Sequence, residues 1–211
     1  MEFKKALHEL RTISEKREFN QTLELVVNLK SFDAQKESVN TFVILPHQYK
    51  KKSIAAFLDS IKKSELLTRI FSKDELDKIQ AKEMKKFAKK QDFFISSAKL
   101  MPLVASKFGK ILGSAGKMPD PKLGCVLMQE SEQNLKEAVD KLQKIARIKT
   151  KERSLKIPLG KESMPDEQLI ENLDKTFKTI VMALPKKEFN IRDVLIKFTM
   201  SKSIKVSQPQ K

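Results

Sequence analysis

Residues 109–118, Gly-Lys-Ile-Leu-Gly-Ser-Ala-Gly-Lys-Met, form the segment closest to a phosphate-binding loop. Such a loop ends in Gly-Lys followed by Ser or Thr, because the lysine contacts the phosphates and the hydroxyl group contacts a bound magnesium ion. Here Met118 follows Lys117, and Ile111 stands five residues before Gly116, where the motif requires glycine. A nucleotide-binding enzyme that uses this segment is therefore only an alternative, to be tested directly.

Histidine and cysteine offer little further chemistry. His8 and His47 are the only histidines, and Cys125 is the only cysteine. The two histidines lack the spacing of a metal-binding pair, and one cysteine builds neither a zinc site nor an intrachain disulfide. Val126 and Leu127 follow Cys125, so we interpret it as a small buried residue rather than a nucleophile. We predict no catalytic residue, no metal and no cofactor, and the cysteine content fits a cytoplasmic protein.

The charge balance indicates a polyanionic partner. The 211 residues include 43 basic and 27 acidic side chains, a net charge of +16. Such an excess attracts nucleic acid, because each neutralised phosphate releases a condensed counterion. An anionic membrane would compete, but no apolar run approaches the roughly 20 residues that span a bilayer, and the first 17 residues are too charged for a signal peptide. We expect RNA or DNA as the partner, and no membrane.

The two ends of the chain carry the most specific candidate binding residues. Residues 22–29 alternate between apolar and other side chains, which is typical of a half-buried strand, and Arg17 and Phe19 stand just before it. A second strand, residues 193–198, ends at Thr199, Met200 and Ser201. If both strands belong to one sheet, these residues share a face that suits folded RNA. Tryptophan is absent and tyrosine occurs once, so recognition by shape is favoured over base stacking. The alternative is an ordinary sheet edge with a polar outer face.

The predicted helices and strands follow one pattern at the two ends of the chain and another pattern in its middle. The ends of the chain combine helices with alternating strands, whereas residues 50–112 alternate buried strands with helices, as in a small parallel sheet covered on both faces. We therefore predict an α+β fold with an inserted α/β domain. A discontinuous split β-α-β domain contains residues 1–50 plus 121–211, and a Rossmann-like three-layer domain contains residues 51–120. Predicted helices cover residues 1–16, 72–90, 102–112, 132–144 and 166–184, and predicted strands or apolar stretches cover residues 22–29, 41–45, 54–58, 66–71, 93–96, 146–149, 154–157, 193–198 and 204–206.

Residues 113–124 contain three of the five glycines and two of the eight prolines. This composition predicts a hinge or functional loop. The residues assigned to it are Gly113, Gly116, Lys117, Met118, Pro119, Pro121 and Gly124.

These segments together resemble the ribosomal protein one family, the L-one stalk protein of the large ribosomal subunit. Residues 17–25, Arg-Glu-Phe-Asn-Gln-Thr-Leu-Glu-Leu, resemble the family's opening strand, and residues 45–47 match its Leu-Pro-His turn. Residues 112–124 resemble its stretch Leu-Gly-Pro-Arg-Gly-x-Met-Pro-x-Pro, and Thr199-Met200 stands where the family has Thr-Met-Gly. The matches keep their order from residue 17 to residue 200.

The resemblance implies a non-enzymatic protein that binds the stalk helices of large-subunit rRNA as a monomer within the cytoplasmic ribosome. It also implies contact with exit-site tRNA, in aid of its release, and repression of translation of the protein's own mRNA. The alternative function is that of a ribosome-assembly or nucleolar RNA-binding factor with the same fold. The residues expected to bind RNA are Arg17, Phe19, Thr22, Glu24, Thr199, Met200, Ser201, Lys202 and Lys205.

Several positions depart from the family pattern. Ser201 replaces a glycine that would let RNA approach the backbone closely. Ser114 and Ala115 replace Pro-Arg and so remove a cation from the central segment, and Gln48 replaces the glycine after Leu-Pro-His. Glu18 stands where many members have a polar or basic residue. We expect these differences to affect RNA affinity and hinge geometry more than the fold.

Overall fold

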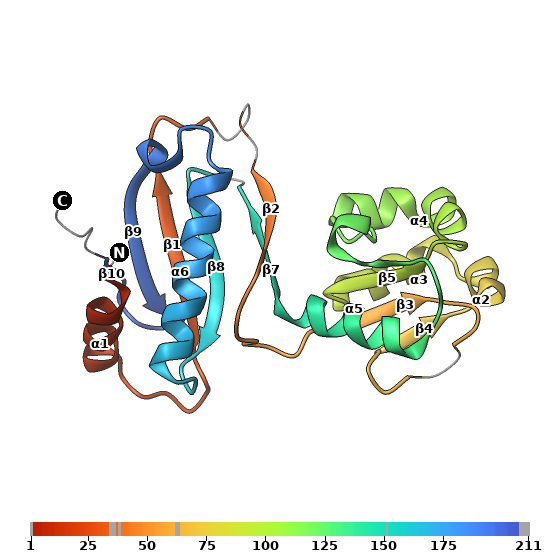
Figure 1. Ribbon diagram of the computed structural model, residues 1–211, viewed down its shortest axis with the longest axis horizontal. Helices are drawn as coiled ribbons and strands as arrows, with labels where there is room; N and C mark the ends of the chain where they lie inside the picture. Colours follow the sequence, from red (N-terminus) through yellow and green to blue (C-terminus); the bar gives the residue numbers. More distant parts are fainter. Residues whose placement is uncertain (1, 34–36, 38, 62–63, 151, 207–211) are drawn as a thin grey trace. The chain divides into compact units, whose positions relative to one another are not determined.

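The computed structural model describes residues 2–33, 37, 39–61, 64–150 and 152–206. The chain divides into two compact units, unit 1 from Met1–Lys50 and Lys144–Lys211, and unit 2 from Lys51–Gln143 (Figure 1). The predicted junction after residue 120 differs from this division. Strand β6 (Val126–Leu127) pairs with a strand of unit 2, and this two-residue strand is too short to give a sequence pattern. The following helix α5 (Glu132–Lys144) has the predicted bounds. All of it except its last residue, Lys144, therefore lies in unit 2.

Unit 1 contains a four-stranded antiparallel sheet in the order β10-β9-β1-β8. Its central strand β1 (Thr22–Leu29) agrees with the predicted range, and its leucines and Val27 are buried on one face. The alternation of side chains along a strand leaves Thr22, Glu24, Val26 and Asn28 on the other face. The remaining strands are β8 (Ser154–Lys161), β9 (Ile191–Phe198) and β10 (Ile204–Lys205).

Helices α1 (Phe3–Ile13) and α6 (Asp166–Ala183) cover one face of this sheet, and Figure 1 shows α6 in front of the sheet, running roughly along its strands. Phe3 of α1 meets Phe177 of α6 edge to face, with ring centroids 6.1 Å apart. Leu7 and Leu173 are fully buried. Burial on this side makes the opposite face of the sheet the surface that a partner can reach. A short 3₁₀ helix, η2 (Lys187–Asn190), joins α6 to β9.

Strands β2 (Asn40–Ile44) and β7 (Ile145–Lys149) form a separate antiparallel ribbon in unit 1. At the end of this ribbon, the Leu45 amide donates to the Lys144 carbonyl at 2.9 Å. Within unit 2, the Lys52 amide donates to Gln143 Oε1 at 2.7 Å, and Gln143 Nε2 donates to the Lys52 carbonyl at 3.0 Å. The Lys52 ammonium also donates to the carbonyls of Leu142 and Gln143. These buried bonds tie the entry and exit of unit 2 to each other.

Unit 2 contains a parallel sheet in the order β4-β3-β5-β6. The chain order reverses between β3 and β5, which is the arrangement of doubly wound α/β folds. All four residues of β3 are buried, as expected of a strand covered on both faces. The strands are β3 (Ile54–Phe57), β4 (Arg69–Phe71), β5 (Phe93–Ser97) and β6, and the helices are α2 (Lys73–Lys78), α3 (Ala81–Lys90), α4 (Met101–Ala115) and α5.

The predicted single helix over residues 72–90 is wrong. Ser72 caps α2 as expected, with its hydroxyl accepting from the Glu75 amide, but Ile79 and Gln80 have extended backbones that separate α2 from α3. No glycine or proline marks this break, so the periodic pattern gave no sign of it.

The predicted hinge over residues 113–124 differs from the structure in two ways. Helix α4 continues through Gly113 to Ala115, and Gly116 ends it with a left-handed φ of 66°. A 3₁₀ turn, η1 (Pro121–Leu123), follows and ends at Gly124, which has a φ of 72°. The whole segment belongs to unit 2, and the junctions between the units lie at residues 50–51 and 143–144 instead. Gly116 and Gly124 end helices, Gly113 lies within α4, and none of the three connects the units.

Candidate nucleic-acid interface

The ends of β1 and β9 meet at one corner of the unit 1 sheet. The strands are antiparallel neighbours, with Leu23 opposite Phe198. The Thr22 amide donates to Thr199 Oγ1 at 3.0 Å, and that hydroxyl donates to the Thr22 carbonyl at 3.4 Å. The start of β1 and the end of β9 are therefore held together at Thr22 and Thr199, two of the residues that the sequence predicted to bind RNA.

Gln21 extends this junction to a third segment. Its side chain is buried, its Oε1 accepts from the Met200 amide at 3.1 Å, and its Nε2 donates to the Glu15 carbonyl at 3.3 Å. Gln21 was not among the predicted site residues, because a polar residue just before a strand is typical of an exposed position. Only the pairing of β1 with β9 reveals its role in fixing the backbone at Met200.

Phe19 and Met200 make this corner partly apolar. Their exposed fractions are 50% and 62%, which is high for large apolar side chains. Phe19 lies two residues before Gln21, and the Met200 backbone is bonded to Gln21, so both belong to the same corner. Thr199 is exposed as well. Single exposed apolar residues need no explanation, but two of them at one corner beside cations form a candidate contact surface.

Cationic side chains stand around this corner. The Lys161 ammonium donates to Thr22 Oγ1 at 2.7 Å and so lies beside the predicted residues, although Lys161 was not predicted as a site residue. Arg17 pairs with Glu15 at 2.8 Å. A surface pocket of ≈ 280 Å³ opens between the end of α1 and the turn after β9. It is lined by Ile13, Ser14, Glu15, Arg17, Gln21, Met200, Ser201 and Lys202.

The other predicted residues have different surroundings. Ser201 Oγ accepts from the Phe198 amide at 2.9 Å, so its hydroxyl closes the turn after β9. Lys205 pairs with Asp193 at 2.6 Å, and its hydrogen bond holds the pKa of that carboxyl below the usual 3.8. Lys202 is exposed and has no ion-pair partner among the described residues. Glu24 lies on the open face of β1, between Lys197 of β9 and Pro158 of β8. Lys202 is therefore a better candidate for a phosphate contact than Lys205.

The residues assigned to the central loop do not form a phosphate site. Lys117 Nζ donates to the carbonyls of Ala88 and Gln91, at 2.8 and 2.5 Å, and so satisfies the end of α3. Met118 packs against the unit 2 core. Gly109 lies inside α4, where the first glycines of a phosphate loop would need an irregular backbone.

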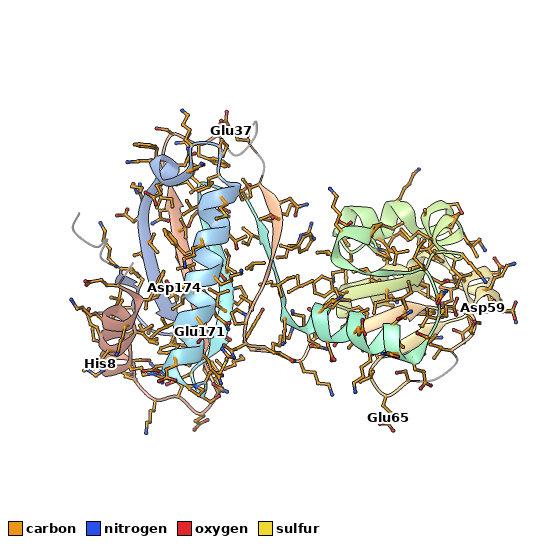
Figure 2. All side chains as sticks on the ribbon, viewed as in Figure 1. His8, Glu37, Asp59, Glu65, Glu171 and Asp174 are labelled. Carbon is orange, nitrogen blue, oxygen red and sulfur yellow. The ribbon has the colours of Figure 1, made fainter. Side chains whose placement is uncertain are left out.

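No other described feature resembles an active site. Burial raises the pKa of the Cys125 thiol to about 11, so this cysteine stays protonated and unreactive at neutral pH. His8 lies on α1 (Figure 2), and His47 Nε2 contacts Glu171 of α6 at 2.7 Å. Within the described parts of the chain, no group of three or more His, Cys, Asp or Glu residues is arranged to hold a metal ion.

Comparison with known proteins agrees with the resemblance. Residues 10–202 match the family described as the ribosomal protein L1p/L10e family. The chain belongs to the ribosomal protein L1 family. Among similar proteins are those named large ribosomal subunit protein uL1 from Nanoarchaeum equitans, 34% identical over 90% of this chain and 93% of the relative, and from Methanocaldococcus jannaschii, 32% identical over 96% and 94%. The uL1 protein of Thermococcus kodakarensis is 35% identical over 96% of this chain and 95% of its own length.

Membership of the L1 family makes this chain a ribosomal protein, a structural class without enzymes, and its location is the ribosome in the cytoplasm. None of the helices that the structure describes is both long and apolar enough to cross a membrane.

Proposed function

We propose that this chain is a structural protein of the large ribosomal subunit that binds the stalk helices of the rRNA through the corner of unit 1. The single observation that carries this proposal is the bonding of Thr22 to Thr199, which joins the two predicted RNA-binding segments. A surface held by hydrogen bonds before binding loses little conformational freedom when RNA docks, and rigid surfaces suit recognition of folded RNA by shape.

The chemistry of the corner supports RNA as the ligand. Lys161, Arg17 and Lys202 supply positive charge for phosphates. The Thr22 hydroxyl accepts from Lys161, and the Thr199 hydroxyl accepts from the Thr22 amide. Glu24 adds a carboxylate that accepts hydrogen bonds from 2′-hydroxyl or base amino groups. A negative side chain opposes binding based on charge alone, so its place on this face favours recognition of a particular RNA structure.

The binding test uses a transcribed fragment of the stalk rRNA and an unrelated hairpin of equal length. We expect the chain to bind the stalk fragment more tightly at the same salt concentration, since phosphate contacts alone do not distinguish the two. Crosslinking followed by sequencing of the bound RNA identifies the contacted helix. Equal affinity for both RNAs, or crosslinks confined to other RNA, contradicts the proposal.

The same fold would also serve a ribosome-assembly factor. Sedimentation after a high-salt wash separates the two roles, because a resident protein stays with mature large subunits and an assembly factor is found only with precursors. The nucleotide-binding alternative has its own direct test, which is equilibrium dialysis with ATP and GTP. We expect no binding, because the Lys117 ammonium already donates to two backbone carbonyls of unit 2.

We further infer that the protein contacts exit-site tRNA to aid its release, and that it represses translation of its own mRNA. Both follow from the resemblance, and a surface that reads folded RNA by shape is also able to bind an mRNA segment that imitates the rRNA site. Competition between the protein's own mRNA leader and the stalk fragment tests the second inference. A leader that fails to displace the fragment argues against it.

A further inference from the structure

A pocket in unit 2 combines an apolar floor with a basic rim. It lies at strand β4 and helix α3 and has a volume of ≈ 390 Å³, within the roughly 300–1,000 Å³ range of small-ligand sites. Its lining residues are Arg69, Phe71, Ile79, Glu83, Met84, Lys86, Phe87 and Lys90. None of these belongs to the corner of unit 1, so the pocket is separate from the proposed rRNA site.

The floor of the pocket is built from aromatic rings in fixed positions. Phe71 and Phe87 meet edge to face with centroids 5.1 Å apart, and Phe87 also contacts Phe94 of β5 at 6.3 Å. Phe71 is buried, whereas Phe87 is half-buried and therefore offers part of its surface to the pocket. A nucleobase stacks on such a surface whatever its identity, because every base has a π face.

Arg69 adds a second flat surface. Its guanidinium carbon lies 4.8 Å from the centroid of the Phe71 ring, and the side chain is 53% exposed. A guanidinium plane held over an aromatic ring leaves its other face open for stacking with a base. The contact with Glu75, at 3.8 Å, is long for an ion pair and leaves the charge available.

Cations on α3 are placed to meet the phosphates on either side of that base. Lys86 and Lys90 are both exposed and stand four residues apart, so they lie on one face of the helix about 6 Å apart along its axis. Helix α3 contains five lysines and a single acidic residue, Glu83. An anionic ligand matches this rim, and a neutral or cationic one does not.

An added peptide strand fits the pocket less well. Strand β4 is at the edge of its sheet, but it has only three residues and thus offers few backbone groups for pairing. We propose that the pocket binds an unpaired nucleotide of single-stranded RNA, with the base against Phe87 and Arg69 and the flanking phosphates at Lys86 and Lys90. This contact goes beyond the proposed rRNA function and does not depend on it.

The test measures binding of the full chain to a fluorescent uridine octamer and to an abasic octamer with the same phosphates. Stacking predicts that the chain prefers the uridine octamer by about fivefold or more. Arg69→Ala should remove most of this preference, whereas the double variant Lys86→Ala with Lys90→Ala should weaken the binding of both octamers. The matched control is Lys136→Ala with Lys141→Ala, which changes the same charge at exposed positions of α5 and should keep both the affinity and the preference.

Three results would overturn the proposal. Equal affinity for the two octamers would mean attraction by charge alone, and equal losses in the pocket and control variants would place the contact elsewhere. A glutamate octamer that displaces the RNA at equal concentration would indicate an acidic peptide as the ligand.

Phe87→Leu, with folding checked by circular dichroism, adds a variant that keeps an apolar floor without an aromatic ring and should also lose the preference. Stalk rRNA binding, measured in parallel on each variant, reports the unit 1 site independently.

Discussion

Gly160 of β8 lies directly under Leu169 of α6, and a methyl group added at Gly160 would overlap Leu169 Cδ2. Leu169 is fully buried, so it has little room to move away. We expect Gly160→Ala to lower the free energy of unfolding by about 1–3 kcal/mol, the usual cost of overpacking a core. Urea denaturation measured by circular dichroism gives the difference.

Gly109 provides the matched control. It lies within α4, and no other group lies within 4 Å of a Cβ added there. Gly109→Ala should therefore stabilise the protein by about 0.8–1.0 kcal/mol, the helix preference for alanine over glycine. The contact between β8 and α6 is not as close as described if both substitutions shift the stability in the same direction.

At Met200, an added negative charge should weaken RNA binding without unfolding the protein. The side chain is 62% exposed and lines the pocket beside Lys202, so Met200→Asp should bring a carboxylate close to RNA phosphates. We expect a loss of about 1–3 kcal/mol in binding free energy for the stalk rRNA fragment. Thr199→Val, which removes the hydroxyl bonded to Thr22, should weaken binding in the same assay.

Met128→Asp is the control for this change, since Met128 is 82% exposed and lies in unit 2. It alters the net charge equally and should leave stalk binding almost unchanged. The corner of unit 1 loses its assignment if Met200→Asp and Thr199→Val both bind with wild-type affinity, or if Met128→Asp weakens binding as much.

Strand patterns show how much of the fold the sequence contains. The alternation from Thr22 to Leu29 predicted β1 with its correct bounds, because one face of that strand is buried and the other is not. The continuous apolar run that includes residues 54–57 predicted a strand buried on both faces. Both signals are local, because the pattern of apolar side chains within each segment is enough to recognise the strand.

Features that depend on distant neighbours were not predictable in this way. The buried side chain of Gln21 accepts from the backbone amide of Met200, which is 179 residues away in the sequence. The break between α2 and α3 and the pairing of β6 with β5 also have no local signal. For the candidate site, the sequence predicted its exposed members, Phe19 and Met200, but missed Lys161 and the buried residue that holds the corner together.

For Lys202, we predict a change in the salt dependence of binding. Its charge has no ion-pair partner among the described residues, whereas that of Lys205 is paired with Asp193. Lys202→Gln should reduce the slope of log affinity against log salt by about 1, the effect of losing one phosphate contact. Fluorescence anisotropy over a range of salt concentrations measures the slope. Lys175→Gln, at an exposed position of α6, is the control and should leave it unchanged. A slope that responds equally to both variants would mean that the RNA has no contact at Lys202.

Glu130 should make the stability of unit 2 depend on pH. Its carboxylate accepts from the amides of Asp59 and Ser60, at 3.0 and 2.6 Å, and Figure 2 shows Asp59 in the loop after β3. Burial opposes ionisation of Glu130, but these hydrogen bonds and one from Ser97 outweigh it and hold the pKa of the carboxyl below the usual 4.5.

A carboxyl whose pKa is lowered by folding stabilises the protein above its unfolded-state pKa, and that contribution disappears as the pH falls through the folded-state value. Glu130→Gln should therefore destabilise unit 2 by about 1–2 kcal/mol at pH 7, since a neutral amide accepts more weakly than a carboxylate. The difference from the wild-type protein should shrink once the pH is below 4.5. Thermal unfolding near pH 7 and about one unit below 4.5 tests this, with Asp140→Asn on α5 as the control for an exposed carboxylate. A difference of the same size at both pH values would show that the ionised carboxylate of Glu130 does not hold the loop after β3.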